Sequence, residues 1–495
     1  MEVDLKRLAL ELDGIDSLML DSEYSFKHLL KAAHPFNKKT AKNLLHYLIL
    51  RSLDIRELQD RLHTGGLSSM ASSESHIRGQ LVAITQRLDE KKLTPKGVFN
   101  YKTGKKSLAD RSSGLFGSKK TDTIPYIMIT LDRDAAREYA KVKNLIQSGM
   151  NIARINCAHD DENIWLQMIL HIKRAVKATG LSCKIYMDLA GPKIRTILKN
   201  KSHLKVFEGK SFYMTDAQHL KDDPKLLGCS VAGISDQIHK GEKVLFDDGL
   251  IEAIVQNIEG AIIKLKVIRI SSKKPFVKNE KGINFPESHL TIPAISEYDL
   301  QCLPFILKHA DLVGYSFVKN EKDVLQLQEM LDTHKDLSLI LKIETLEAVN
   351  NLPDLLFAGM RNKNFGVMIA RGDLAIEIGF ERMSEIQEEI LWICEAAHVP
   401  VIWATQVLET LNKSGLATRS EITDAAHAAM ADCVMINKGN HILQTIETLQ
   451  DILQRSGGHH VKKRFTFRPL TIASNFVSSK TSFSNLQNPS LPLFF

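Results

Sequence analysis

The feature that most constrains this chain is a repeated alternation of short apolar segments with amphipathic helical segments. From about residue 124 onward there are eight such apolar segments, most followed by a stretch with helical periodicity such as REYAKVKNLIQSG or NEKDVLQLQEML. Nearly continuous apolar segments of this length are typical of strands that are buried on both faces of a parallel sheet. The predicted strands span residues 125–131, 151–156, 183–189, 311–317, 338–344, 365–370, 400–405 and 433–437. Eight alternating units predict an α/β fold of the (β/α)₈ class, the TIM barrel.

A region with a different hydrophobic pattern separates the third predicted strand from the fourth. Within residues 198–283, the stretches VFEGKSFYM, KVLFDDGLIEAIV and AIIKLKVIRIS alternate in polarity and are separated by turn residues. This pattern predicts an inserted small β-barrel domain, which divides the (β/α)₈ barrel into residues 124–197 and 284–456. The insertion leaves the barrel through a loop at the face where TIM-barrel active sites form, so we expect it to act as a lid.

The flanking regions differ from the barrel in composition. Residues 1–95 are poor in glycine and place apolar residues three and four positions apart, as in TAKNLLHYLILRSLDIRELQDRL, which predicts a helical N-terminal region. Residues 96–123 are rich in Gly, Ser and Lys and are expected to form a linker. Residues 457–495 are rich in Ser, Asn and Pro and are expected to form a C-terminal tail.

Composition excludes several classes of protein. No apolar run approaches the roughly 18 residues of a membrane span, and the N-terminal stretch MEVDLKRLALELD carries acidic residues that targeting signals avoid. The six cysteines are scattered without metal-type spacing, which is typical of a reduced chain. The 65 basic and 58 acidic residues form no dense basic patch interleaved with aromatics. We therefore expect a cytoplasmic protein with no nucleic-acid or membrane partner.

Polar residues collect where the predicted strands end, which is where a TIM barrel carries its catalytic groups. Glu344 and Asp373 follow neighbouring strands, and Lys342 precedes the first of them by two residues. Two carboxylates supplemented by water and an anionic substrate suit Mg²⁺, and nearby cations suit a phosphorylated or enolate substrate. The same residues are also compatible with an interior ion pair beside a polar loop. The strand-end residues are Arg154, Asn156, Asp188, Lys342, Glu344, Arg371, Gly372, Asp373, Thr405 and Gln406.

Ten short motifs, several of which include these strand-end residues, follow one another along the chain: ARINCAHD, MDLAGPKIRT, FDDGLI, KGINFP, IPAISEYD, SFVKNEKDV, LKIE, MIARGDLAIEIG, ATQVLE and TRSEITDAA. Over about residues 124–455 they resemble, in order and spacing, the motifs of the pyruvate kinase family. The resemblance implies phosphoryl transfer from phosphoenolpyruvate to ADP, giving pyruvate and ATP in glycolysis. It also implies Mg²⁺ as cofactor, with Mn²⁺ as a substitute, and allows a homo-oligomer. The regulatory domain that usually ends such chains has no counterpart in residues 457–495.

The resemblance also implies roles for individual residues. Glu344 and Asp373 would bind Mg²⁺, and Lys342 would stabilise the phosphoryl group in flight. Thr405 would hold the substrate carboxylate together with the backbone of Gly372 and Asp373.

Four further residues are implied in phosphate and nucleotide binding. Arg154 would be catalytic and would contact the substrate phosphate, and Asn156 and Arg195 would contact the nucleotide. Lys281 would reach the nucleotide from the inserted domain.

The chain departs from the family at several positions. In potassium-dependent members four side-chain oxygens bind the ion, but here Ala158 and Leu189 replace two of them and leave Asn156 and Asp188. Lys193 stands where those members have Glu, so we expect the lysine to replace K⁺ and the protein to need no potassium. The first strand continues as TLDRDAA, and the last is followed by NKGNH rather than Ser-Gly-Glu-Thr.

Two other readings remain open from the sequence. Mg²⁺-dependent lyases and aldolases on the same barrel bind pyruvate enolate with a paired Glu and Asp, although they generally lack an inserted β domain. A non-catalytic regulatory homologue is favoured by the departures at Ala158 and NKGNH. An enzyme is favoured by the retained strand-end residues, which are Lys342, Glu344, Asp373 and Thr405.

Overall fold

The computed structural model describes residues 4–89, 95, 97–121, 123–199, 202–223, 225–271, 275–331 and 337–457, and the backbone of 460–461 and 464–465. Eight parallel strands close into a barrel in the order β1-β17-β16-β15-β14-β13-β3-β2. This confirms the predicted TIM barrel, and each predicted strand contains one observed strand. The barrel strands are β1 (Tyr126–Thr130), β2 (Ile152–Asn156), β3 (Lys184–Asp188), β13 (Leu312–Tyr315), β14 (Ser338–Ile343), β15 (Phe365–Ala370), β16 (Val401–Ala404) and β17 (Cys433–Ile436).

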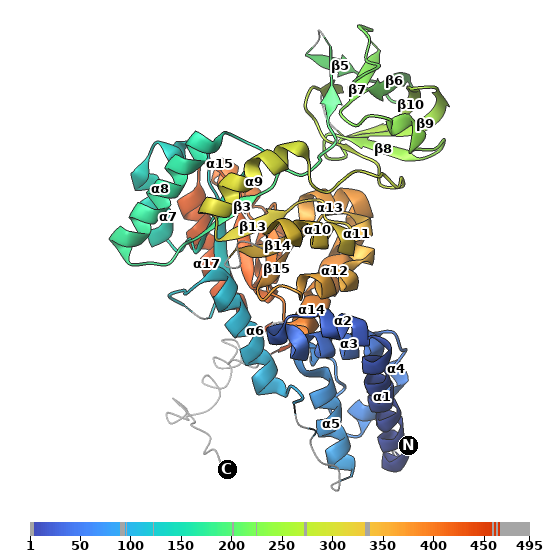
Figure 1. Ribbon diagram of the computed structural model, residues 1–495, viewed down its shortest axis with the longest axis vertical. Coiled ribbons are helices and arrows are strands. Elements are labelled where there is room, and N and C mark those ends of the chain that lie inside the picture. Colours follow the sequence, from blue (N-terminus) through green and yellow to red (C-terminus); the bar gives the residue numbers. More distant parts are fainter. Residues whose placement is uncertain are drawn as a thin grey trace, which may run out of the picture.

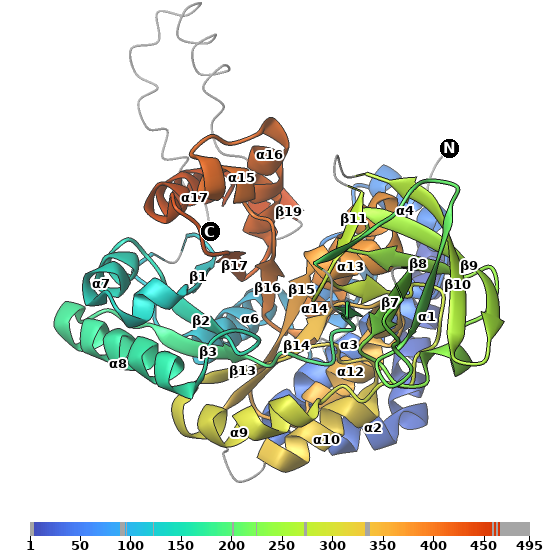
Figure 2. The same cartoon turned by 90° about the horizontal axis from the view of Figure 1, so that it is seen from above.

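Helices surround the barrel (Figures 1 and 2). The longer helices pack against it through an apolar stripe. In α8, for example, Trp165, Met168, Ile169 and Ile172 are buried at spacings of three and four residues. The surrounding helices are α7 (Tyr139–Gln147), α8 (Glu162–Thr179), α9 (Glu297–His309), α10 (Glu321–Leu331), α11 (Leu346–Asn350), α12 (Leu352–Gly359), α13 (Arg371–Ile378), α14 (Met383–Ala397), α15 (Glu409–Ser414), α16 (Arg419–His427) and α17 (Ile442–Gly457).

The insertion forms a seven-stranded sheet in the order β12-β8-β9-β10-β6-β7-β4, accompanied by the pair β11-β5. An antiparallel bridge between Arg195 and Gly282 brings the two ends of this sheet together. In both views the inserted domain lies on the side of α13 and away from α7 and α8 (Figures 1 and 2). Its strands are β4 (Thr196–Ile197), β5 (His203–Lys205), β6 (Ser211–Asp216), β7 (Leu226–Cys229), β8 (Lys243–Phe246), β9 (Ile251–Glu259), β10 (Ile262–Ile270), β11 (Phe276–Lys278) and β12 (Ile283–Asn284).

The N-terminal helices lie at the opposite end of the barrel from the inserted domain (Figure 1). α3 packs against α14, and the Asn43 side-chain amide donates to the carbonyl of Ala396 at 2.8 Å. The Asn37 amide donates to the carbonyl of Met360 at 3.0 Å, so polar bonds as well as apolar contacts hold this region to the barrel. The helices are α1 (Leu5–Ser25), α2 (Lys27–Ala32), α3 (Lys38–Arg51), α4 (Arg56–Thr64), α5 (Ile77–Leu88) and α6 (Tyr101–Phe116).

Helix α6 corrects the expectation of a linker over residues 96–123. The helix begins with a capping box formed by Asn100 and Thr103, and it buries Leu108, Leu115 and Phe116. These apolar positions are seven and eight residues apart, a helical spacing that the high Gly, Ser and Lys content of the segment obscures. Leu115 and Phe116 belong to the same apolar cluster as the barrel interior, so the segment closes the floor of the barrel.

The expected C-terminal tail lies mostly outside the described residues. Within it the structure describes the end of α17 at Gly457 and a short antiparallel pair, β18 (His460–Val461) and β19 (Arg464–Phe465). None of the helices in the described part of the chain combines the length and the apolar character that crossing a membrane requires.

Candidate active site

A buried ionic network occupies the mouth of the barrel, at the carboxyl ends of β2, β3 and β14. Asp188 is 1% exposed, and its Oδ2 accepts from Arg154 Nε at 3.1 Å and Nη2 at 2.5 Å. The same oxygen accepts from Lys342 Nζ at 3.2 Å. One carboxylate therefore holds two cations from different strands.

Lys342 has three oxygen partners in this network. Its Nζ lies 2.7 Å from Ser316 Oγ, 3.0 Å from Glu344 Oε1 and 3.2 Å from Asp188 Oδ2. Burial alone would lower the pKa of Lys342, but Asp188 and Glu344 outweigh it and the pKa is raised. Lys342 is thus a permanently charged, oriented cation at the barrel mouth.

The two neighbouring cations keep the Asp188 carboxyl ionised. Burial would raise the pKa of this carboxyl, but Lys342 and Arg154 outweigh it and the pKa is lowered. Arg154 also donates from Nη1 to Thr130 Oγ1 at 2.9 Å. Three of its five N–H groups are engaged by these bonds, which leaves two directed elsewhere.

Glu344 and Asp373 form the pair of carboxylates expected from the sequence. Glu344 is 2% exposed, and its Oε2 accepts from the Phe317 N–H at 2.6 Å. Burial is the main cause of its raised pKa, Lys342 opposes the rise and the Asp373 carboxylate adds to it. A divalent cation would offset the repulsion between these carboxylates, so the residues present fit Mg²⁺ with further ligands from water and substrate. No group of three or more His, Cys, Asp or Glu that could hold a metal occurs within the described part of the chain.

A third group lies where β15 runs into α13. The Gly372 N–H donates to Thr405 Oγ1 at 2.7 Å, so the threonine hydrogen is free to donate to a ligand. Thr405 has a φ of 66°, a left-handed conformation that is strained for a threonine and that marks functional loops. A helix N-terminus, a threonine hydroxyl and an acidic pair thus lie together, and such a combination can accommodate a small carboxylate beside a metal.

Lys193 lies against this group rather than against Asp188. Its Nζ donates to Asp373 Oδ1 at 2.8 Å, and the pKa of Lys193 is raised because Asp373 outweighs the effect of burial. One turn further along α13, the Asn284 amide donates to Glu377 Oε1 at 2.8 Å. Both chain crossings between barrel and inserted domain are therefore tied to α13.

Arg195 and Lys281, two of the residues expected to contact the nucleotide, lie where the chain crosses between the barrel and the inserted domain. Arg195 bridges to Gly282 and donates from Nη1 to the carbonyl of Glu280 at 3.0 Å. Lys281 forms an ion pair with Asp247 at 2.8 Å. Neither side chain lines the cavity that contains Arg154 and Asn156, although burial lowers the pKa of His159, which lines it, and Arg195 is close enough to help lower that pKa.

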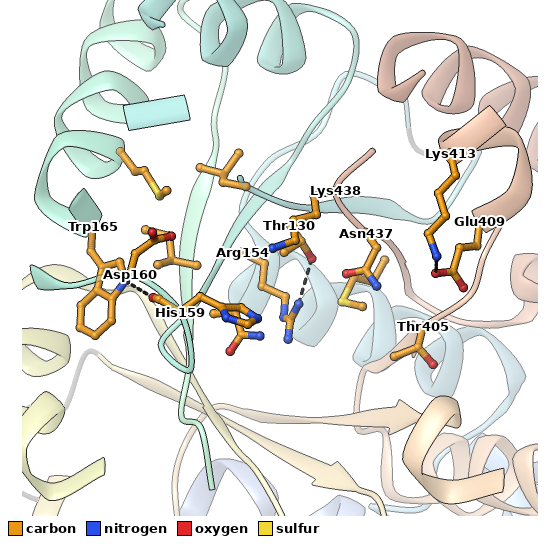
Figure 3. A pocket seen from close by; sticks show the side chains of 15 residues that line it. Thr130, Arg154, His159, Asp160, Trp165, Thr405, Glu409, Lys413, Asn437 and Lys438 are labelled. Atoms are coloured by element: carbon orange, nitrogen blue, oxygen red, sulfur yellow. Dashed lines mark hydrogen bonds and ion pairs between the residues drawn. The ribbon is translucent and has the colours of Figure 1, made fainter. Parts of the chain in front are cut away.

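That cavity has a volume of about 350 Å³, and among its lining residues are the predicted Arg154, Asn156 and Thr405. Figure 3 shows Arg154 in its middle, with His159 and Trp165 on one side and Asn437, Glu409 and Lys413 on the other. Most of these lining residues are not among the site residues predicted from the sequence. Two of them, Thr130 and Asn437, end or directly follow β1 and β17, so applying the strand-end rule to the first and last strands would have found them.

Comparison with known proteins agrees with this geometry. The chain matches the family model "Pyruvate kinase, barrel domain" over residues 124–441. It is 31% identical over 331 residues to a pyruvate kinase of Geobacillus stearothermophilus, covering 65% of this chain and 55% of that protein. It is 30% identical over 353 residues to a pyruvate kinase of Thermotoga maritima, covering 70% of this chain and 72% of that protein.

The chain thus spans little more than half the length of the Geobacillus relative. The matched residues include the whole closed barrel, the Arg154, Asp188 and Lys342 network, and the Glu344 and Asp373 pair. On the strength of that match, the chain belongs to the pyruvate kinase family.

Proposed function

We propose that this protein is a pyruvate kinase that transfers the phosphoryl group of phosphoenolpyruvate to ADP, giving pyruvate and ATP in the cytoplasmic reactions of glycolysis. The observation that carries the proposal is the placement of Lys342, a buried cation with three oxygen partners beside the Glu344 and Asp373 pair. Phosphoryl transfer depends on positioning and charge neutralisation more than on covalent help, and this site offers both.

Each part of the substrate has a candidate partner. The substrate carboxylate would bind the Thr405 hydroxyl and the backbone of α13 at Gly372 and Asp373, with the Gly372 N–H shared between the carboxylate and Thr405 Oγ1. The phosphoryl group would lie between Arg154, which has two N–H groups to spare, and Lys342. As the bond from phosphorus to the enol oxygen breaks and a bond to the ADP β-phosphate oxygen forms, these cations would balance the charge on the phosphoryl oxygens.

Glu344 and Asp373 would hold Mg²⁺. When bound, the metal would neutralise phosphate charge and orient the reacting oxygens. Lys193 is bonded to Asp373 Oδ1, so the metal would bind through Asp373 Oδ2 or share Oδ1 with the lysine.

The nucleotide would bind on the lid side of the mouth, through Asn156 on the barrel and through Arg195 and Lys281 at the crossing. Lys281 is paired with Asp247 in the inserted domain. A rigid movement of that domain would bring its basic residues over the barrel mouth, as is common for active-site lids.

A coupled assay for ATP formation from phosphoenolpyruvate, ADP and Mg²⁺ tests the proposal. The expected result is ATP formation that requires all three components and that is absent from a Lys342→Met preparation purified in parallel, which excludes a contaminating host kinase. Metal-dependent enolisation of pyruvate without ATP formation would instead identify a lyase or aldolase on the same barrel. Neither activity in folded protein would identify a non-catalytic binding module.

A further inference from the structure

A tyrosine inside the barrel contacts the ionic network from below. Tyr186 is the third residue of β3 and is fully buried, and its ring belongs to the apolar cluster of the barrel interior. Residues two apart on a strand share a face, so Tyr186 and Asp188 both point inward. The Tyr186 hydroxyl donates to Asp188 Oδ1 at 3.0 Å.

Because of this bond, the two oxygens of the Asp188 carboxylate have different hydrogen-bond partners. Oδ2 accepts from both cations, Arg154 and Lys342, whereas the Tyr186 hydroxyl donates to Oδ1. The terminal torsion of an aspartate is broad, so the cations alone would allow the carboxylate to rotate and share its oxygens between them. A donor fixed to a packed aromatic ring removes that freedom.

The neighbouring strand leaves the space that this arrangement needs. Gly314 on β13 pairs with Asp188 across the sheet. A Cβ at Gly314 would lie 1.9 Å from the Tyr186 hydroxyl and 2.3 Å from Asp188 Oδ1. Any larger residue at Gly314 would therefore collide with both groups, so the tyrosine and the glycine form one packing unit under the carboxylate.

We propose that Tyr186 is a positioning residue for phosphoryl transfer: its hydroxyl fixes the Asp188 carboxylate, which in turn holds Arg154 and Lys342 in the arrangement that receives the phosphoryl group. This inference rests on the proposed kinase activity. The Tyr186 hydroxyl donates to Asp188 and not to a substrate group, and its ring lies beside Arg154, its register partner on β2.

The chain offers a matched control on the next strand. Tyr315 on β13 is also fully buried, but its hydroxyl has no hydrogen-bond partner among the described residues. Tyr186→Phe and Tyr315→Phe therefore remove the same atom from two interior positions, and only the first should disturb the network.

The first experiment compares the kinetics and thermal stability of these two variants. We expect Tyr186→Phe to lower kcat about tenfold, the effect of losing a hydrogen bond to a charged group, while the KM for ADP stays within about twofold. Tyr315→Phe should keep the wild-type kcat. A kcat for Tyr186→Phe equal to that of Tyr315→Phe, at any melting temperature, would overturn the inference.

A double-mutant cycle tests whether Tyr186 acts through Asp188. In an Asp188→Asn background the carboxylate that pairs with the cations is already absent, so adding Tyr186→Phe should change kcat by less than about twofold. If Tyr186→Phe lowered kcat by the same factor in the Asp188→Asn background as in the wild type, the inference would be contradicted.

Binding of inorganic phosphate, measured by calorimetry, separates this inference from the proposed function. If the wild type forms no ATP, the kinase proposal fails, and the positioning role is then judged on phosphate alone. About tenfold weaker phosphate binding by Tyr186→Phe, with wild-type binding by Tyr315→Phe, would support the role of the hydroxyl. Equal phosphate affinity in the two variants would overturn it.

Discussion

The two ends of the barrel are built from the same eight strands but bury opposite kinds of groups. At the floor, Leu115 and Phe116 of α6 enter an apolar cluster in which ring and aliphatic groups supply the contacts. At the mouth, Arg154, Asp188 and Lys342 are buried to a similar degree but are all charged. Burial of apolar groups at the floor stabilises the fold. Burial of charged groups at the mouth costs hydration free energy, and only pairing of opposite charges offsets that cost. Substitutions at the floor should therefore change stability, and those at the mouth should change chemistry.

The largest expected effect is at the floor. Phe116→Ala should lower the free energy of unfolding by about 3–5 kcal/mol, because it leaves a cavity between α6 and the barrel interior. The kcat of the folded fraction should remain at the wild-type value. Urea unfolding followed by fluorescence measures the first quantity and the coupled assay the second. Phe380→Ala, at a side chain that is 69% exposed, is the control and should be nearly neutral. A stable Phe116→Ala protein with reduced kcat would contradict the division between the two ends.

The next effect is at the mouth. Lys342→Met removes the cation that would meet the phosphoryl group, and we expect kcat to fall by about a hundredfold or more. Because Asp188 and Glu344 would lose a buried partner, stability should fall as well. Lys342→Arg keeps the charge but changes its position, so it should preserve more of the stability than of the activity. Wild-type turnover in folded Lys342→Met would refute the assigned role.

Metal activation tests the acidic pair at the mouth. Glu344→Gln and Asp373→Asn should each raise the Mg²⁺ concentration for half-maximal activity by about tenfold or more, since each removes an anionic oxygen from a hard cation with few protein ligands. Glu377→Gln is the matched control, because that side chain lies one turn along α13 and bonds to Asn284. Unchanged midpoints in both test variants would place the metal elsewhere.

A pH-dependent effect is expected at the junction of the floor and the N-terminal helices. His398 is fully buried, and its ring centroid lies 4.4 Å from that of Phe99. Burial, with a contribution from the nearby basic residues Arg111, His76 and Lys39, lowers the pKa of His398 to about 3. A histidine whose folded pKa lies below its unfolded value of about 6.5 contributes full stability above pH 6.5 and loses it as pH falls toward 3. At pH 5 the loss should be about 2 kcal/mol.

Urea unfolding of the wild type and of His398→Gln between pH 7 and pH 5 measures this contribution. The variant should show a smaller loss of stability over the same range, whatever its absolute stability. Parallel pH dependences in the two proteins would show that His398 does not contribute.

The smallest expected effect concerns potassium. Lys193 supplies a fixed cation beside Asp373 at 2.8 Å, so activity should change by less than about twofold when K⁺ replaces a non-coordinating cation at constant ionic strength. Lys193→Ala should lower activity at every salt concentration. Lys193→Glu combined with Leu189→Thr and Ala158→Ser should shift the protein toward potassium dependence. Strong activation of the wild type by K⁺ would refute the prediction.

Much of the site could be predicted from the sequence because its determinants are local. The apolar strands are short and nearly continuous, and the position of a residue at a strand end follows from that pattern alone. That pattern therefore predicts Lys342, Glu344 and Asp373 at the barrel mouth, and the match to the pyruvate kinase family covers all three residues.

Only the tertiary structure decided which of these groups touch. The resemblance to the family puts Asp188 and Lys193 in one cation site, but folding pairs Asp188 with Arg154 and Lys342 and pairs Lys193 with Asp373. These contacts join residues more than thirty positions apart, so no local pattern encodes them. The helix α6 was missed because its stability comes from packing against the barrel floor and not from its composition. What the sequence determined by itself was the order of strands and the chemistry at their ends, since both follow from short-range periodicity. Which charges neutralise one another was decided by the pairing and curvature of the strands, because β2 lies beside β3 and the curvature of the barrel brings the end of β14 toward both.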